Sequence, residues 1–492
     1  MLQLKLKTTI IYTILGFLPL SFSLIFTPIY TKYLSIEDYG LLNLFNVISS
    51  ILIPFFGLGI DQAAGFLYWD YSKDKKKLSE FMSTTISLIF IIAIVIFLLG
   101  ILFGQSIVKM FVKNGNQFNL WPFLLLSLAY SFFMILSRIL LYYYRNEGDI
   151  KKYALLNVSS LILITSGSII AIIILKNGAE GAVEGRTIGF CGIIFAFVLY
   201  EIKKIGMFYN KGIANLLLKM GKALFFSTLI GTLAYVADRL IIEQLGTLEM
   251  LGIYGFAVTV ASLIEILLSA LGNSFIPIVY KNILEETEEN IKNTRFQLFI
   301  FIYLLIAAIV LITSIITPFI KFFISSNFYQ SIQYIPMLCL SFIPRGFAQI
   351  FSLKLYKKKK TTYLLYLNIS YLISILILGP IFYHFFGIKG VVLSVFTTSL
   401  INMLLSIIVS RKIDNLNFMF SKLYMFFSII SASIFALWLI PNNWHFHSLF
   451  YACPLIVFIV FSFVIHKEEC LKMKEYIISI FSNSYARKTN NL

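Results

Sequence analysis

The sequence has few charged residues and few cysteines, and it lacks the motifs of soluble enzymes. Charged residues make up 13% of its 492 positions, against about 25% in soluble proteins. The four cysteines form no Cys-x-x-Cys pair, so neither a disulfide framework nor a zinc site is predicted. No phosphate-binding loop of the Gly-x-x-x-x-Gly-Lys-Ser/Thr type occurs, and no stretch between apolar runs is long enough for a soluble catalytic domain. We therefore expect no cofactor and no metal.

Apolar residues are correspondingly abundant. They reach 59% of the chain, aromatic residues reach 16%, and the mean hydropathy is +0.88. A membrane-spanning helix needs about 20 apolar residues, and fourteen runs of this kind occur. The runs are too long for barrel strands and do not alternate with a period of two, so the sequence predicts an all-α polytopic membrane protein. The runs are 10–31, 41–66, 81–104, 120–143, 154–175, 182–201, 220–243, 251–278, 296–318, 332–354, 363–384, 390–410, 423–440 and 448–466.

The basic residues predict the orientation of these spans. The net charge is +17, which in a soluble protein would point to nucleic acid but in a membrane protein is a topology signal, so no nucleic-acid partner is expected. With fourteen spans, 30 Lys and Arg fall on the side that carries both termini and 6 on the other side. Positive loops stay in the cytoplasm. We therefore expect both termini to be cytoplasmic.

An internal repeat divides the chain. The segment Leu34-Ser-Ile-Glu-Asp-Tyr-Gly-Leu41 aligns with Gly246-Thr-Leu-Glu-Met-Leu-Gly-Ile253 at an offset of 212, and further matches continue at offsets of 211 and 209. The period covers six spans, so both copies insert with the same orientation, as in transporters built from two parallel lobes. The sequence thus predicts an N-lobe at 1–212, a C-lobe at 213–414, and two additional helices with a cytoplasmic tail at 415–492.

This pattern resembles the polysaccharide (O-antigen or capsule) flippase family of the multidrug/oligosaccharidyl-lipid/polysaccharide exporter superfamily. The resemblance rests on a first helix with two prolines, Gly16-Phe-Leu-Pro19 and Thr27-Pro-Ile-Tyr30, then on 34–41, and then on Gly57-Leu-Gly59. It implies alternating access between two lobes. The implied location is a bacterial cell (inner) membrane. The implied substrate is an undecaprenyl-pyrophosphate-linked oligosaccharide, moved to the outer leaflet for surface polysaccharide biosynthesis. A polysaccharide polymerase and glycosyltransferases would be its partners, beside the bilayer lipids.

Three arginines inside predicted spans are candidates for binding the pyrophosphate. Arg138 and Arg345 lie in the fourth span and in its repeat equivalent, one helical turn apart after alignment. A charge at this depth is costly and faces a cavity or a partner by default, and Arg grips phosphate bidentately. Arg138 lies near a span end, so extension toward water is the alternative for it. Arg239 is the third candidate, with a structural ion pair to Glu243 at i,i+4 as its alternative.

Three acids are candidates for coupling transport to an ion gradient. Asp61 and Glu265 lie deepest in their spans, and Asp238 precedes Arg239. A carboxyl group that is desolvated at this depth can exchange protons near neutral pH, whereas a hydrogen-bonded structural acid is the alternative. Glu184 and Arg186 lie close to the outer interface, where exposure to water costs little, so a structural interpretation is favoured there.

Three other functions stay open. A multidrug or cation-coupled exporter of the same superfamily typically has twelve spans and binds cationic drugs with acids, whereas this chain places arginines in its spans. A membrane polymerase acting on the same lipid carrier would carry a large outer loop or a clustered acidic motif. A lipid scramblase would need a polar groove facing lipid. We expect a transporter and not an enzyme.

Overall fold

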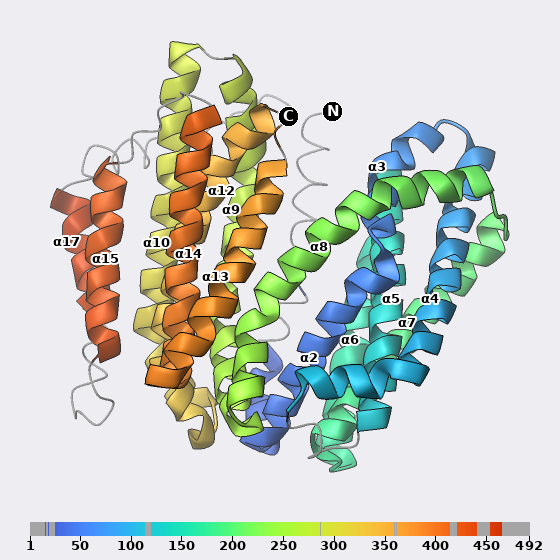
Figure 1. Cartoon of the computed structure of the whole chain (residues 1–492), viewed down its shortest axis with the longest axis horizontal. Coiled ribbons are helices and arrows are strands. Elements are labelled where there is room, and N and C mark those ends of the chain that lie inside the picture. Colours follow the sequence, from blue (N-terminus) through green and yellow to red (C-terminus); the bar gives the residue numbers. More distant parts are fainter. Residues whose placement is uncertain are drawn as a thin grey trace, which may run out of the picture. The chain divides into compact units, whose positions relative to one another are not determined.

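The computed structural model is almost entirely helical. It describes residues 25–113, 120–285, 287–358, 360, 362–413, 421–439 and 453–464, together with Leu15 and Leu18. Across these residues there is no β-strand (Figure 1). Eleven helical segments within them are long and apolar enough to cross a membrane. The all-α polytopic class is therefore confirmed, while the count of fourteen spans stays a prediction.

The helices follow the predicted apolar runs. Residues 25–33 are helical, and then come α2 (Ile36–Gly57), α3 (Ile60–Tyr71), α4 (Lys75–Phe111), α5 (Leu120–Glu147), α6 (Ile150–Ile169), the π-helical turn η1 (Ile170–Ile174), α7 (Gly178–Ile205) and α8 (Lys211–Leu245). The rest of the described chain forms α9 (Leu248–Glu285), α10 (Glu288–Phe323), the 3-10 segment η2 (Ser326–Gln333), α11 (Ile335–Leu340), α12 (Phe342–Lys357), α13 (Thr362–Phe386), α14 (Ile388–Ile413), α15 (Ser421–Leu439) and α17 (Cys453–Val464).

Polar residues just before several helices determine where those helices begin. Ser35 and Asp38 form a capping box at the start of α2, in which each side chain accepts the other residue's backbone N–H. Asp74, Asp149 and Asn210 accept backbone N–H groups at the starts of α4, α6 and α8. These side chains satisfy donors that have no partner inside the helix, so the short polar connections separate long apolar helices.

The run 41–66, expected as one helix, is broken. Leu58 (φ 43°) and Gly59 (φ 73°) adopt left-handed backbone conformations between α2 and α3. The break packs closely on α8, because a Cβ on Gly59 would lie 2.3 Å from the carbonyl oxygen of Gly221. Only a glycine combines this φ with this approach. As a result, Asp61 lies in the first turn of a second helix instead of in the middle of a span.

Helices α6 and α7 are in backbone contact through glycines. A Cβ on Gly185 would lie 2.2 Å from the carbonyl oxygen of Gly167, and one on Gly189 would lie 2.6 Å from that of Leu163. Together with Gly181, the two α7 glycines form a Gly-xxx-Gly-xxx-Gly stripe, the spacing that lets membrane helices approach closely. This contact orients α7 and therefore the residue that follows Gly185, which is Arg186.

The helices group into two compact units. The first contains the described residues up to Leu263 with 323–331 and 365–398, and in it α5, α6 and α7 lie side by side (Figure 1). The second contains 264–322, 332–364 and the described residues from Ser399 onward. In this second unit the rings of Tyr303, Phe426 and Phe458 contact one another and join α10 to α15 and α17. The division into lobes at 212 and 414 stays a prediction.

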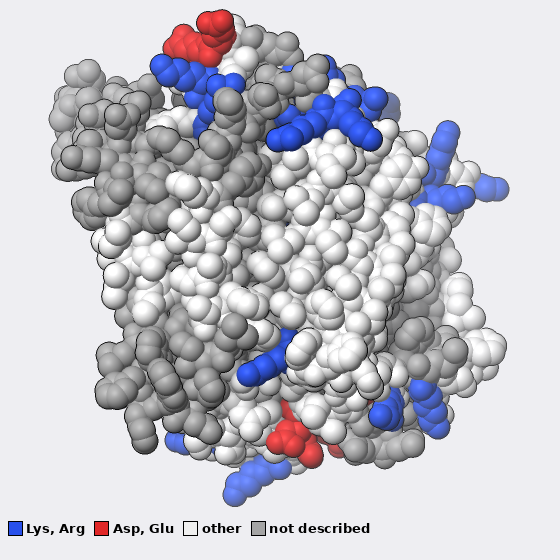
Figure 2. Space-filling view, turned by 60° about the vertical axis from the view of Figure 1, so that its left-hand side comes forward, with Lys and Arg blue, Asp and Glu red and all other residues white. Residues whose placement is uncertain are grey.

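The surface of the helices is that of a membrane protein. On the face drawn in Figure 2, Lys and Arg lie toward the helix ends, and the surface between them carries little charge. Large apolar side chains such as Leu102 and Ile188 are about 70% exposed, as expected where lipid is the solvent. Lys354, the last residue of the predicted span 332–354, lies within α12 and is 1% exposed.

Candidate functional site

A polar cavity of about 280 Å³ lies inside the first unit. Its described lining comes from the helix before α2 and from α2, α5, α6, α7 and α9. The lining residues are mostly aromatic, hydroxyl or amide side chains, and Arg186 is the one charged residue among them: Phe26, Thr27, Tyr30, Tyr39, Leu42, Asn43, Asn46, Tyr130, Leu161, Ile164, Thr165, Ser168, Arg186 and Thr259. A cavity of this composition suits a polar ligand with an aromatic-facing surface.

Arg186 is held at the cavity by two rings and one amide. Its guanidinium lies 5.2 Å from the ring centre of Phe45 and 5.1 Å from that of Tyr130. Its Nη1 donates to Oδ1 of Asn46 at 3.0 Å, and its buried Nε has no hydrogen-bond partner within the described residues. The sequence favoured a structural interpretation here. The Gly-xxx-Gly-xxx-Gly stripe of α7 was the available signal, because it indicates which face of α7 packs on α6.

Asp61 and Arg138, predicted as separate candidates, lie together. The Asp61 carboxylate is 3.8 Å from Nη1 of Arg138, with side chains 5% and 40% exposed. The break at Leu58 and Gly59 places Asp61 beside α5, and the first turn of α3 favours a negative charge. At 3.8 Å the contact is long, and Arg138 is partly exposed, so Asp61 occupies few of its five N–H donors. The pairing was missed because sequence alone does not show that the helix is broken.

Asp238 and Arg239 form a buried cluster on α8. Arg239 Nε donates to Asp238 Oδ1 at 3.3 Å, and its Nη2 donates to the carbonyl oxygen of Tyr235 at 2.7 Å. Asp238 Oδ2 accepts the hydroxyl of Tyr254 at 2.6 Å. Glu243, the expected i,i+4 partner, is buried and accepts the backbone N–H of Lys113. Arg239 contacts the adjacent carboxylate of Asp238, which the sequence analysis did not predict, and the pairing with Glu243 stays a prediction.

Arg345 and Glu265 belong to the second unit. Arg345, in α12, lies over the ring of Phe342 at 5.0 Å, and its Nε is 3.4 Å from the hydroxyl of Ser399. Gly346 beside it packs against Leu305 of α10. Glu265 is half-buried in α9. Their roles in binding and coupling stay predictions.

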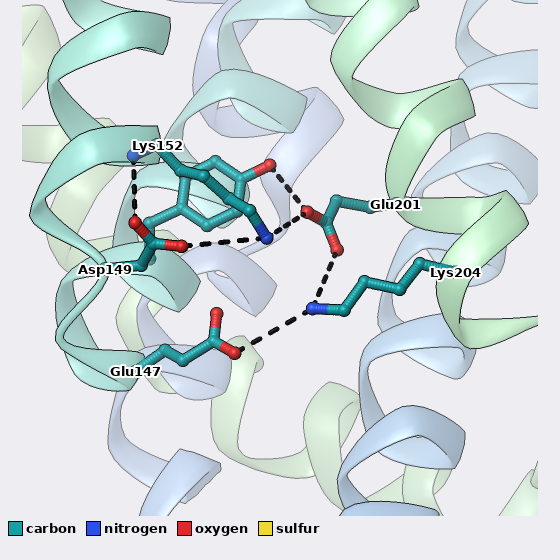
Figure 3. A network of polar contacts seen from close by, with 6 residues as sticks. Glu147, Asp149, Lys152, Glu201 and Lys204 are labelled. Atoms are coloured by element: carbon teal, nitrogen blue, oxygen red, sulfur yellow. Dashed lines mark hydrogen bonds and ion pairs between the residues drawn. The ribbon is translucent and has the colours of Figure 1, made fainter.

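A further charged network, missed from sequence, joins the ends of α5, α6 and α7 (Figure 3). Glu201 is 1% exposed and accepts from the Tyr144 hydroxyl at 3.0 Å and from Lys152 Nζ at 3.3 Å. Lys204 lies 3.9 Å from Glu201 and 3.8 Å from Glu147. All five residues lie at the predicted cytoplasmic ends of their helices, so the network ties three helices together there.

The starts of α2 and α9 contact each other reciprocally. A Cβ on Gly40 would lie 2.1 Å from the carbonyl oxygen of Leu248, and one on Gly252 would lie 2.1 Å from that of Ile36. Gly40 and Gly252, like Ile36 and Leu248, are separated by the repeat offset of 212. Two-fold related elements make such self-complementary contacts, in which i touches j and j touches i.

Comparison with known proteins supplies a family and a fold. The family model described as "Polysaccharide biosynthesis protein" matches residues 6–283. No curated protein sequence gives a significant match.

Several solved membrane transporters have the same fold. The lipid II flippase MurJ, in an inward closed conformation, aligns with a TM-score of 0.68 at 18% identity, covering 93% of this chain and 99% of MurJ. An inward-facing MATE family multidrug resistance transporter of the MOP superfamily aligns with a TM-score of 0.67 at 16% identity, covering 81% and 95%. An outward-facing MATE structure aligns with a TM-score of 0.58 at 16% identity, covering 84% and 96%.

Proposed function

The chain belongs to the polysaccharide biosynthesis protein family, and from this we propose that it is a flippase for a lipid-linked oligosaccharide. It is a multi-span membrane transporter of the MOP superfamily. The proposed substrate is an undecaprenyl-pyrophosphate-linked repeat unit, which the protein moves from the cytoplasmic to the outer leaflet of the inner membrane for O-antigen or capsule synthesis. A polymerase and glycosyltransferases would act on the same lipid.

The observation that carries this proposal is the combination of the two comparisons. The family description concerns polysaccharide, and MurJ, which this chain matches over nearly its full length, is named a flippase of a lipid. A lipid-linked saccharide is the substrate that agrees with both descriptions, because it contains a sugar and is carried by a lipid. Its polar head cannot cross hydrocarbon unaided, and arginines within the spans offer the compensating charge.

Alternating access between two six-helix repeats is the proposed mechanism. The reciprocal contact of Gly40 with Leu248 and of Gly252 with Ile36 supports a two-fold relation between the repeats. Arg345 and Arg138 are the proposed pyrophosphate ligands. Arg239 would join them only if Asp238 released it. Asp61, Glu265 and Asp238 remain the proposed coupling acids.

The test is a deletion strain in which the leaflet position of the lipid-linked oligosaccharide is measured. We expect the oligosaccharide to accumulate on the cytoplasmic leaflet and the wild-type chain to restore its export. Arg345→Ala should abolish this rescue at normal protein levels, and Arg345→Lys should rescue only partly, because Lys lacks the bidentate fork. Arg411→Ala, at an exposed position near the end of α14, is the matched control and should rescue fully.

A multidrug exporter is the second candidate, supported by the likeness to MATE transporters. In that case deletion would leave the oligosaccharide correctly distributed and would instead raise sensitivity to cationic drugs. Full rescue by Arg345→Ala would remove that residue from the site without deciding between the two functions.

A further inference from the structure

Arg186 differs from other intramembrane arginines of the first unit in having no acidic partner. Arg138 lies beside Asp61 and Arg239 beside Asp238. Among the residues that the structure describes, no carboxylate comes within ion-pair distance of Arg186, whose contacts are Asn46, Phe45 and Tyr130. A guanidinium carries five N–H donors. The buried Nε of Arg186 has no hydrogen-bond partner among these residues, so this donor is available to an anionic ligand.

The cavity beside Arg186 supplies a place for that anion. Its described lining contains no Asp or Glu, so nothing there repels a negative ligand. Asn43, Asn46, Thr165 and Ser168 offer amides and hydroxyls, and the tyrosines of the lining offer ring faces. Amide and hydroxyl groups hydrogen-bond sugar hydroxyls, and rings stack against sugar faces. A volume of about 280 Å³ suits one sugar-sized group, not a whole oligosaccharide.

Building on the proposed function, we infer that this cavity binds the oxyanion of the transported head group through Arg186. The oxyanion is either a sugar carboxylate or a phosphate, since both present the planar or forked oxygens that Arg grips. The two rings orient the guanidinium. Arg186 and Asn46 lie within the first three turns of α7 and α2. The head group is thus engaged near the predicted outer ends of these helices.

Binding can be measured on the purified full-length protein in detergent, without transport. The probes are glucuronate, inorganic pyrophosphate and neutral glucose, titrated calorimetrically. We expect glucuronate or pyrophosphate to bind in preference to glucose, and Arg186→Gln to weaken anion binding by roughly tenfold or more, as for one lost charge-assisted contact. Arg186→Lys should retain part of the affinity. Arg145→Gln, at an exposed position at the end of α5, is the matched control and should bind like wild type.

The outcomes separate the two sources of the anion. Preference for pyrophosphate assigns the cavity to the lipid diphosphate, and preference for glucuronate assigns it to an acidic sugar. Binding of neither anion by wild type, or equal anion binding by a folded Arg186→Gln variant, would overturn the inference. Asn46→Ala offers a second variant that keeps the charge, and it should weaken binding less than Arg186→Gln.

Failure of this inference is distinct from failure of the proposed function. If the oligosaccharide accumulates on the cytoplasmic leaflet in the deletion strain while Arg186→Gln binds anions normally, the flippase function is supported and the assignment of the cavity is refuted. If the wild-type protein binds anions through Arg186 but the oligosaccharide is correctly distributed in the deletion strain, the proposed substrate is refuted and the anion site at Arg186 is supported.

Discussion

Adding one methyl group at Gly40 or Gly252 tests whether the α2–α9 contact stabilises one conformation of the transporter. Each new Cβ would lie 2.1 Å from a carbonyl oxygen of the other helix, that of Leu248 or Ile36. Close-packed interiors do not accommodate such an approach, so the two helices must separate by about 1 Å to reach ordinary contact distance. The backbone contact is then lost at the predicted outer ends of both helices.

The size of the effect follows from the cost of overpacking. Forcing an extra carbon into a packed interface costs about 1–3 kcal/mol. In a protein that alternates between two states, this cost falls only on the state in which the helices touch. Gly40→Ala should therefore shift the population toward the state without the contact by about 5–150-fold. Gly252→Ala should act equally, because its contact is the repeat equivalent.

Labelling of a single cysteine measures this shift. Asn43 lies against Gly255 where the two helices meet, and it is 9% exposed. Asn43→Cys in a background without the four native cysteines should react slowly with an impermeant maleimide, and faster once Gly40→Ala is added. Gly231→Ala is the control, since a Cβ there meets nothing within 4 Å. Equal labelling in the Gly40→Ala and Gly231→Ala variants, at equal thermal stability, would refute the reasoning.

Two further predictions concern the charged contacts. Glu201→Ala should lower the free energy of unfolding by about 3 kcal/mol, the lower end for a broken buried ion pair because the lysines reach water; Glu184→Ala, exposed on the same helix, should change it by less than about 0.5 kcal/mol. Thermal unfolding in detergent compares the two, and equal shifts would contradict a buried role for Glu201. A double-mutant cycle of Asp61→Asn and Arg138→Ala should give a coupling below about 1 kcal/mol, since Arg138 is half exposed. A coupling of several kcal/mol would show that the pair is closer and drier than described.

Long periodic features were predictable from sequence, and local breaks were not. Each predicted run from 41–66 onward has a helical counterpart, because about 20 apolar residues have few alternatives in lipid. The break at Leu58 and Gly59 was hidden, since Leu favours a helix and its left-handed conformation depends on packing against α8. The candidate acids and arginines were found by their cost in a membrane, which needs no coordinates.

The contacts between charged side chains could not be predicted from the sequence. The order of residues placed Asp61 and Arg138 in different helices, and only the packing of α3 on α5 shows that they meet. Arg186 was discounted for its nearness to a span end, yet glycine contacts between α6 and α7 direct it to an internal cavity. Glu201 was not predicted because it is a single acid at a helix end, but five charged or phenolic groups contact it or its two lysines.

The sequence by itself indicated that the helices lie in lipid, that the fold is all-α, that the chain contains a repeat, and which family it resembles. These features depend on the length and spacing of apolar residues, which are local properties of the chain. Tertiary structure decided which charges are compensated and which one faces a cavity. The position of each charge depends on how closely helices that are far apart in sequence approach each other. At the closest contacts, this approach is possible because a glycine has no Cβ atom.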